Sequence, residues 1–226
     1  MKFPKLVKGI FCRRVNRFVA EVEIDGTVEK CHVKNTGRLR ELLFPGATVY
    51  CEVHPEGNRK TKFSLLLVQH GGELVCIDSQ APNKLAWEFV SSGGLGFIPE
   101  QLRREVTHGD SRFDLHLEHG EHRGFIEVKG VTLVEDGIAM FPDAPTERGT
   151  KHLRGLAAAV QEGYDAWVLF IVQRSDVTGF TPNDSGDPDF GKALREAVDA
   201  GVQVMAVTCE VTEAGSQTAA PIPVRL

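Results

Sequence analysis

The chain has 226 residues, of which 42% are hydrophobic and 25% charged, and its formal net charge is −5 at pH 7. This composition is ordinary for a globular protein, and the length allows one large domain or two small ones. No apolar run reaches the length of a membrane span, so the sequence predicts no membrane partner. The basic N-terminus lacks the apolar stretch of a signal peptide.

Five cysteines are spread along the chain without any Cys-x-x-Cys spacing. An odd number of widely spaced thiols is typical of reduced cysteines rather than of a disulfide framework. The sequence therefore predicts a cytoplasmic protein. The cysteines are Cys12, Cys31, Cys51, Cys76 and Cys209.

Charge is distributed unevenly along the chain. Residues 1–70 contain 13 Lys and Arg against 7 Asp and Glu, a net charge of +6. Residues 71–226 contain 13 against 24, a net charge of −11. The first part can attract phosphates, and the second has carboxylates that can hold a divalent metal. An uneven distribution without functional meaning is the alternative interpretation.

The first 80 residues are predicted to be a β domain. Residues 18–24 precede Asp25-Gly26, a strong hairpin signal, and residues 27–33 return as the next strand. Residues 38–43 predict a short helix that ends before Pro45-Gly46. Five short strands with one small helix are typical of an OB-like barrel. The remaining three strands are predicted over residues 47–53, 63–69 and 74–77.

Residues 81–226 are predicted to form a mixed α/β (α+β) domain. A helix beginning at Pro82 is followed by three strands, and two further helices alternate with strands. The strands are expected over residues 103–107, 112–118, 124–133, 166–172 and 202–208, and the helices over 84–90, 147–162 and 188–200.

Two of these strands carry a candidate site. In residues 112–118 the apolar Phe113, Leu115 and Leu117 alternate with polar residues that include Asp114. A tight hairpin with Gly120 as its first central residue places Asp114 opposite Glu127. Lys129 lies two residues beyond Glu127 and therefore on the same face. A shift of one residue in register would move Glu127 to the other face.

Two neighbouring carboxylates repel each other unless a cation lies between them. Oxygen ligands of this kind suit Mg²⁺ or Mn²⁺, which can polarise a phosphate and activate a water. Lys129 can orient that water or stabilise the charge that develops on the phosphate. The spacing of Asp114, Glu127 and Lys129 therefore predicts metal-assisted phosphodiester hydrolysis. The alternative is a hairpin with a charged solvent face.

The Asp, Glu-x-Lys hairpin followed by a helix and a strand resembles the PD-(D/E)XK nuclease core. In that superfamily a preceding helix often adds a Glu to the catalytic residues. Glu88 lies in the matching element, and Glu105 is the competing candidate. A Gln at the end of the following strand also recurs, and Gln173 matches it.

A set of motifs extends nearly from end to end of the chain. They are Asn35-Thr36-Gly37-Arg38, Pro82-Asn83-Lys84-Leu85, Ser111-Arg112-Phe113-Asp114, Ile126-Glu127-Val128-Lys129, Val131-Thr132-Leu133, Phe141-Pro142-Asp143-Ala144, Thr146-Glu147-Arg148-Gly149 and Lys151-His152-Leu153-Arg154. With these motifs the whole chain resembles the sugar fermentation stimulation protein A (SfsA) family. The resemblance implies an OB-like domain followed by a PD-(D/E)XK nuclease-like domain, DNA as partner, and metal positions at Asp114, Glu127 and Val128.

Basic residues in both domains are candidate contacts to the DNA backbone. In the barrel they are Lys34, Arg38, Arg40, Arg59, Lys60 and Lys62, and at the start of the helix after the Glu-x-Lys strand they are Arg148, Lys151 and His152.

Three functions are compared. The first is a Mg²⁺- or Mn²⁺-dependent DNA nuclease acting on single- or double-stranded DNA. The second is a DNA-binding regulator of sugar-metabolism genes that keeps the nuclease fold without turnover. The third, a sugar- or metabolite-binding protein, is suggested only by the family name. The intact Asp, Glu and Lys favour the first, because a pure binder gains little from an acidic pair that faces phosphates. A homodimer is one assembly that the sequence leaves open.

Overall fold

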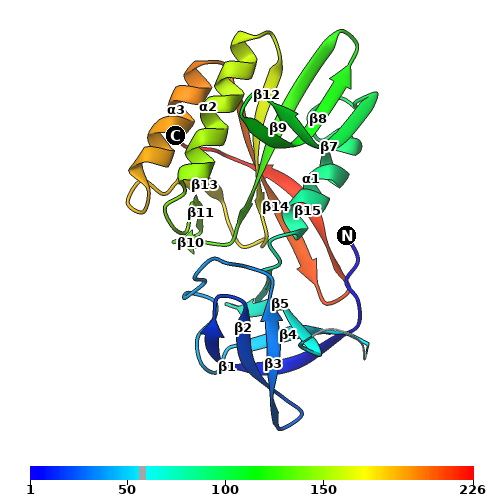
Figure 1. Ribbon diagram of the computed structural model, residues 1–226. Coiled ribbons are helices and arrows are strands. Elements are labelled where there is room, and N and C mark those ends of the chain that lie inside the picture. The colour runs from blue at the N-terminus through cyan, green and yellow to red at the C-terminus, as the bar shows by residue number, and fades with distance from the viewer. Residues whose placement is uncertain (56–59) are drawn as a thin grey trace.

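A computed structural model describes residues 1–55 and 60–226 of the chain. Figure 1 shows two lobes, a small barrel built by the N-terminal part and a larger α/β lobe built by the rest. No helix in the described part of the chain is long and apolar enough to cross a membrane.

The small lobe is a barrel that β1 to β5 close, and β6 extends its sheet beyond β5. Its sheet has the order β3-β2-β1-β4-β5-β6, and a parallel pairing of β3 with β5 closes it. An OB-like barrel was predicted, and this is confirmed. Its core cluster lies inside the closed sheet. The strands are β1 (Leu6–Asn16), β2 (Val19–Ile24), β3 (Thr27–Val33), β4 (Thr48–Val53), β5 (Phe63–His70) and β6 (Glu73–Cys76).

The turn between β2 and β3 is confirmed, because Asp25 and Gly26 both have positive φ, as this type of hairpin requires. The helix predicted over residues 38–43 is wrong. Leu39 has a φ of +48°, which interrupts a right-handed helix at its start. A single turn forms instead, in which the N–H of Leu43 donates to the carbonyl of Leu39 over 2.7 Å.

Strand β1 was not predicted from the sequence, although it is the longest strand of the barrel. Lys8, Arg13 and Arg14 interrupt its apolar pattern, and two bulges with β2 disturb the alternation further. Phe11 is its large buried side chain. The strand was missed because its pairing with both β2 and β4 is a long-range property.

The larger lobe contains a six-stranded mixed sheet of order β15-β14-β12-β9-β8-β7. β9, β12 and β14 are parallel, whereas the pairs at both edges are antiparallel. A mixed α/β domain was predicted, and this is confirmed. The strands are β7 (Gln101–His108), β8 (Ser111–His119), β9 (His122–Val131), β12 (Asp165–Val172), β14 (Gln203–Thr212) and β15 (Gly215–Ile222).

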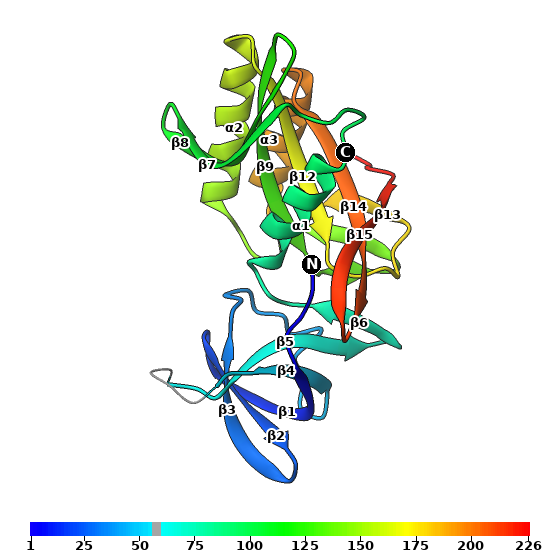
Figure 2. The same cartoon turned by 90° about the vertical axis from the view of Figure 1, so that its right-hand side faces the viewer.

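Helices cover both faces of this sheet, as Figure 2 shows. α1 (Ala81–Ser91) packs on one face, and α2 (Glu147–Gln161) and α3 (Pro188–Asp199) pack together on the other. Each face has its own core cluster. The two sides of β9 are therefore buried under different helices, which decides where its polar side chains point.

Four short or irregular strands of this lobe were not predicted. β10 (Val134–Glu135), β11 (Ile138–Phe141) and β13 (Gly179–Pro182) form a separate three-stranded sheet. β15 has the sequence GSQTAAPI, in which Gly, Ala and Pro hide the alternation that marks a strand. β15 is identified as a strand by its antiparallel pairing with β14, which the sequence alone does not reveal.

The two lobes are joined by more than the connecting chain. The N–H of Phe3 donates to the carbonyl of Ala214, and the terminal amine of Met1 reaches the α/β lobe (Figure 1). At the opposite side the N–H of Cys76, at the end of β6, donates to the carbonyl of Gln173 over 3.1 Å. The end of the barrel is thereby fixed against the carboxyl end of β12.

Candidate metal centre

The hairpin of β8 and β9 has the register that the sequence predicted. Gly120 has a φ of +58° as the first central residue of the turn, and the pairs from His119 opposite His122 to Leu115 opposite Ile126 follow from it. The next position in this register would place Asp114 opposite Glu127. Backbone pairing stops before that position, and the side chain of Asp114 instead accepts a hydrogen bond from β9.

Asp114 lies where β8 changes the face that it buries. Phe113 packs in the core beneath α2, whereas Leu115 and Leu117 pack in the core beneath α1. The prediction of one shared apolar face is therefore wrong for Phe113. The change of face coincides with an irregularity in the neighbouring strand, where Glu105 has a φ of +56° and the β7–β8 ladder lacks the pair beside Asp114.

The carboxylate of Asp114 bridges β9 and α1. Its Oδ2 accepts a hydrogen bond from the N–H of Val128 over 2.8 Å, and its Oδ1 accepts one from Nδ2 of Asn83, also over 2.8 Å. Asn83 belongs to the motif Pro82-Asn83-Lys84-Leu85, but no role was predicted for it. Its position in the first turn of α1, after Pro82, was the only available signal.

Glu127 is the most enclosed carboxylate of the site, with only 3% of its surface exposed. Its Oε1 lies 2.6 Å from Nζ of Lys129 and 2.5 Å from Nδ1 of His152. Its Oε2 is buried and has no hydrogen-bond partner among the described residues. One oxygen of the carboxylate is thus held by Lys129 and His152, and the other is free to bind a ligand.

The two carboxylates have opposite pKa shifts. Burial and the nearby charge of Glu127 raise the pKa of Asp114, and the hydrogen bonds from Val128 and Asn83 offset this only in part. Burial also acts to raise the pKa of Glu127, but the hydrogen bond from His152 and the charge of Lys129 outweigh it and lower the pKa. The two carboxylates therefore repel each other, and the repulsion raises the pKa of Asp114 rather than that of Glu127.

The donor set consists of hard oxygen atoms. Nowhere in residues 1–55 and 60–226 do three His, Cys, Asp or Glu side chains gather as a metal-binding group. A metal held here would rest on the two carboxylates, and its other ligands would be peptide oxygens, water or substrate. Mg²⁺ is bound in this way, because it keeps several waters and takes one or two carboxylates.

Neither candidate Glu joins this pair. Glu88 is 53% exposed in its side chain and binds the terminal amine of Met1 over 2.9 Å. It lies on the exposed side of α1, away from the face that carries Asn83 toward Asp114. Glu105 pairs with Arg112 over 2.8 Å and is also largely exposed. The structure therefore places Asn83, not a Glu of α1, beside the carboxylates.

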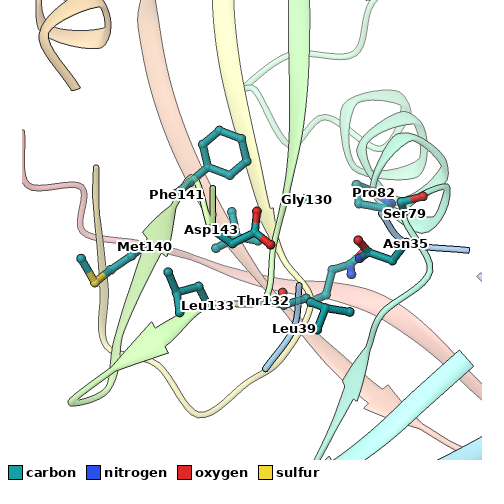
Figure 3. A pocket seen from close by; sticks show the side chains of 12 residues that line it. Asn35, Leu39, Ser79, Pro82, Gly130, Thr132, Leu133, Met140, Phe141 and Asp143 are labelled. Carbon is teal, nitrogen blue, oxygen red and sulfur yellow. The ribbon is translucent and has the colours of Figure 1, made fainter. Parts of the chain in front are cut away.

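Gln173 lies at the end of β12, as predicted, but it faces the junction between the lobes. Its Nε2 donates to the carbonyl of Cys76, and its Oε1 is buried without a partner among the described residues. Together with Pro82 and Gly130 it lines a pocket beside the site, which Figure 3 shows.

The predicted DNA contacts of the barrel divide into two groups. Arg38, Arg40 and Lys60 are exposed, whereas Arg59 lies outside the described residues. Lys34 is half-buried, and its Nζ lies 3.0 Å from Oε2 of Glu52, with Asp78 also in range. Lys34 therefore forms ion pairs within the protein, whereas it was predicted to contact phosphate.

The three candidate phosphate contacts on α2 lie on different faces of the helix. Arg148 and Lys151 are exposed, but His152 has turned inward and is only 6% exposed. Leu153, Leu156 and Ala159 share this buried side of the helix. His152 was predicted to reach phosphate near the metal, and the structure places its ring in the interior, with Nδ1 at 2.5 Å from Oε1 of Glu127.

The chain matches two family models that follow one another. One is described as the N-terminal OB domain of SfsA and matches residues 12–77. The other is described as the RE domain of the sugar fermentation stimulation protein and matches residues 80–215.

Relatives match over the full length. A sugar fermentation stimulation protein homolog of Desulfitobacterium hafniense is 51% identical over 94% of this chain and 93% of its own. A homolog of the same name from Ruminiclostridium cellulolyticum is 45% identical over the whole of both chains. The solved structure of Pyrococcus furiosus SfsA in complex with Ca²⁺ is 33% identical, covers 100% of this chain and 98% of that one, and has a TM-score of 0.90. The chain belongs to the sugar fermentation stimulation protein A family.

Proposed function

We propose that this protein is a DNA-binding, divalent-metal-dependent nuclease of the PD-(D/E)XK type. The observation that carries the proposal is the environment of Glu127. A buried carboxylate with one oxygen held by Lys129 and His152, and the other without a partner, has the form of an incomplete coordination site. Leaving a buried acceptor unpaired costs about 1–3 kcal/mol, and a bound cation would remove that cost.

Mg²⁺ or Mn²⁺ fits the donors better than a softer metal. Asp114 and Glu127 would hold the ion through their carboxylates, and Val128 would add its peptide carbonyl. The related Pyrococcus furiosus SfsA was solved with Ca²⁺, another hard cation that takes oxygen ligands. The raised pKa of Asp114 supports the same proposal, because a cation between the carboxylates would relieve their repulsion.

A divalent ion in this position supplies Lewis-acid polarisation of a phosphate and lowers the pKa of an attacking water. The protein supplies the orientation. Lys129, held by Glu127, can position the water or stabilise negative charge on the phosphate. Asn83 and Val128 fix both oxygens of Asp114, so that its carboxylate has one orientation before any ligand binds.

The path of the DNA strand follows from the exposed cations. Arg38 and Arg40 lie on the loop after β3, at the junction of the lobes, and Arg148 and Lys151 lie at the start of α2. These four side chains are exposed and can neutralise phosphates of a bound strand. The outer side of the barrel is less suited, because there Arg13 is already paired with Glu21.

The test is a cleavage assay with labelled single- and double-stranded DNA in Mn²⁺, Mg²⁺ or EDTA. Wild type should cleave only with metal, and Asp114→Ala and Lys129→Ala should each abolish cleavage. Lys192→Ala is the matched control, because this lysine is 76% exposed on α3, with its Nζ 3.9 Å from Glu196. DNA left intact by wild type under every condition, with binding retained, would favour the regulator without turnover.

A further inference from the structure

A pocket without an assigned role lies beside the site, at the junction of the lobes. It has a volume of about 130 Å³ and receives residues from the barrel, from the start of α1 and from the end of β9. Figure 3 shows Asn35 and Leu39 of the barrel loop facing Gly130, Thr132 and Asp143 of the α/β lobe.

Close approaches on both sides form this pocket. A Cβ at Gly37 would lie 2.5 Å from Oδ2 of Asp143, so the barrel loop packs directly against that carboxylate. A Cβ at Gly130 would lie 2.6 Å from Cγ of Pro82. Arg14 fixes the loop from behind, because its guanidinium donates to the carbonyls of Asn35 and Gly37. These close contacts hold the walls of the pocket in place without a ligand.

The buried unpartnered atom and the charged group among the described residues that line the pocket, Oε1 of Gln173 and the carboxylate of Asp143, are both acceptors. The amide of Asn35 is satisfied by Ile77 and Gly37, and the hydroxyl of Ser79 donates to the carbonyl of Lys34. Oε1 of Gln173 is buried and unpartnered among the described residues, with only 1% of that residue exposed. No described lining residue is Lys or Arg, so the pocket suits hydrogen-bond donors and repels phosphate.

The volume and the lining of the pocket restrict the class of ligand further. Pockets for drug-sized ligands have roughly 300–1,000 Å³, so this one admits a single small ring system. Leu39, Pro82 and Phe141 provide apolar surface, and Asp143 provides a carboxylate at the mouth. Flat apolar faces with an edge of donors are the chemistry of a nucleobase that carries an amino group. Enzymes that extract bases read them by the same combination of stacking and edge hydrogen bonds.

The pocket and the metal centre share two structural elements. Gly130 directly follows Lys129 on β9, and Pro82 directly precedes Asn83 on α1. A strand whose phosphate lies at Asp114 and Glu127 therefore passes the mouth of the pocket.

We propose that the pocket holds one amino-bearing nucleobase, that of adenosine or cytidine in preference to thymidine, next to the phosphate at the metal centre. Where adenine and cytosine carry an amino group, thymine carries a carbonyl oxygen, which would be repelled by the acceptor oxygens of Gln173 and Asp143. This inference rests on the proposed function for the course of the strand, whereas binding of a free nucleoside needs only the pocket.

Saturation-transfer NMR on the full-length protein tests the pocket alone, with deoxyadenosine, deoxycytidine, thymidine and deoxyribose as probes. The base protons of the first two should receive saturation, and thymidine and deoxyribose should not. Leu133→Trp fills the pocket and should remove the signal, since Leu133 is half-buried and outside the three core clusters. Ile138→Trp, on β11 but outside the pocket lining, is the control and should retain it.

Fluorescence anisotropy with labelled dA, dC and dT homopolymers tests the same preference on DNA. Wild type should bind dA and dC about tenfold more tightly than dT, the ratio expected from one hydrogen bond. Asp143→Asn should reduce this ratio, whereas Asp136→Asn, an equal charge change at the exposed β10–β11 turn, should not.

The outcomes separate this inference from the proposed nuclease. Equal saturation of all nucleosides, or a signal that survives Leu133→Trp, overturns the base pocket even where Asp114→Ala abolishes cleavage. Selective saturation that Leu133→Trp removes supports the pocket even where no DNA is cleaved, and in that case the nuclease proposal fails.

Discussion

Oδ2 of Asp114 accepts a hydrogen bond from the backbone N–H of Val128 over 2.8 Å, at the point where β8 and β9 stop pairing. The carboxylate thereby replaces a ladder hydrogen bond and is drawn between the strands, beside Glu127. One strand defect accounts for the position, the burial and the raised pKa of Asp114 together.

The contact between His152 and Glu127 predicts a positioning role for the histidine. His152→Ala should weaken Mn²⁺ binding about 10–100-fold, the range found when a residue that orients a metal ligand is removed. The DNA affinity measured in EDTA should stay unchanged, because His152 is buried. Arg148→Ala is the control on the same helix, with the opposite pattern expected. A loss of DNA affinity in His152→Ala without a change in metal affinity would contradict this role.

The pKa of Asp114 predicts how metal binding depends on pH. Because burial and Glu127 raise this pKa, Asp114 becomes protonated at a higher pH than an ordinary Asp as the solution is acidified. Mn²⁺ affinity should therefore begin to fall above the usual Asp range. Titrations of Mn²⁺ at several pH values would measure this, and a fall confined to the ordinary Asp range would contradict it.

The same shift predicts an effect on folding without metal. A carboxyl whose pKa is raised on folding adds stability below its unfolded pKa and loses it as pH rises through the folded pKa. At neutral pH in EDTA, Asp114 is thus a destabilising charge, and Asp114→Asn should raise the midpoint of thermal unfolding. In wild type, Mn²⁺ should raise the midpoint, and in Asp114→Asn it should not.

Much of this site could be predicted from the sequence because its geometry is local. The turn at Gly120 fixed the register of the hairpin, and the register brought Asp114 to Glu127. Asn83 could not be predicted, because a helix from another part of the chain delivers it. The burial of His152 needed the orientation of α2 against the sheet, which the sequence indicates only as one of several faces.

In the barrel, too, the features set by local sequence could be predicted, and those set by distant elements could not. Strands β2 and β3 follow from a strong turn signal between them. Strand β1 is basic and bulged, and only its two neighbours identify it. Lys34 was expected at the surface because lysines usually are, yet Glu52 and Asp78 supply an ion pair from other elements.

Arg14 is predicted to stabilise the barrel far more than its neighbour Arg13. Arg14 donates to four backbone carbonyls of residues 16, 17, 35 and 37, and to a fifth at 38. Arg14→Ala should cost about 1–3 kcal/mol, a drop of roughly 2–4 °C in Tm for each kcal/mol. Arg13→Ala removes only an exposed pair with Glu21 and should change Tm little. Equal losses in both variants, by thermal denaturation, would contradict this assignment.

The cations at the junction predict the salt dependence of DNA binding. Each phosphate contact that is lost should reduce the slope of log affinity against log salt by about 0.9 for duplex DNA. Replacing Arg38 and Arg40 by Ala should therefore flatten the slope, whereas replacing Arg13 should not, because Arg13 lies on the outer barrel paired with Glu21. An unchanged slope in the Arg38 and Arg40 variant would remove this loop from the DNA path.

The central claim is that Asp114 and Glu127 form the divalent-metal centre. It is tested most directly by Mn²⁺ titration with detection of free Mn²⁺ by electron paramagnetic resonance. Wild type and Glu88→Ala should bind the ion alike, because Glu88 is paired with the amine of Met1, and Asp114→Ala and Glu127→Ala should lose it. Equal Mn²⁺ binding by wild type, Asp114→Ala and Glu127→Ala would contradict the account.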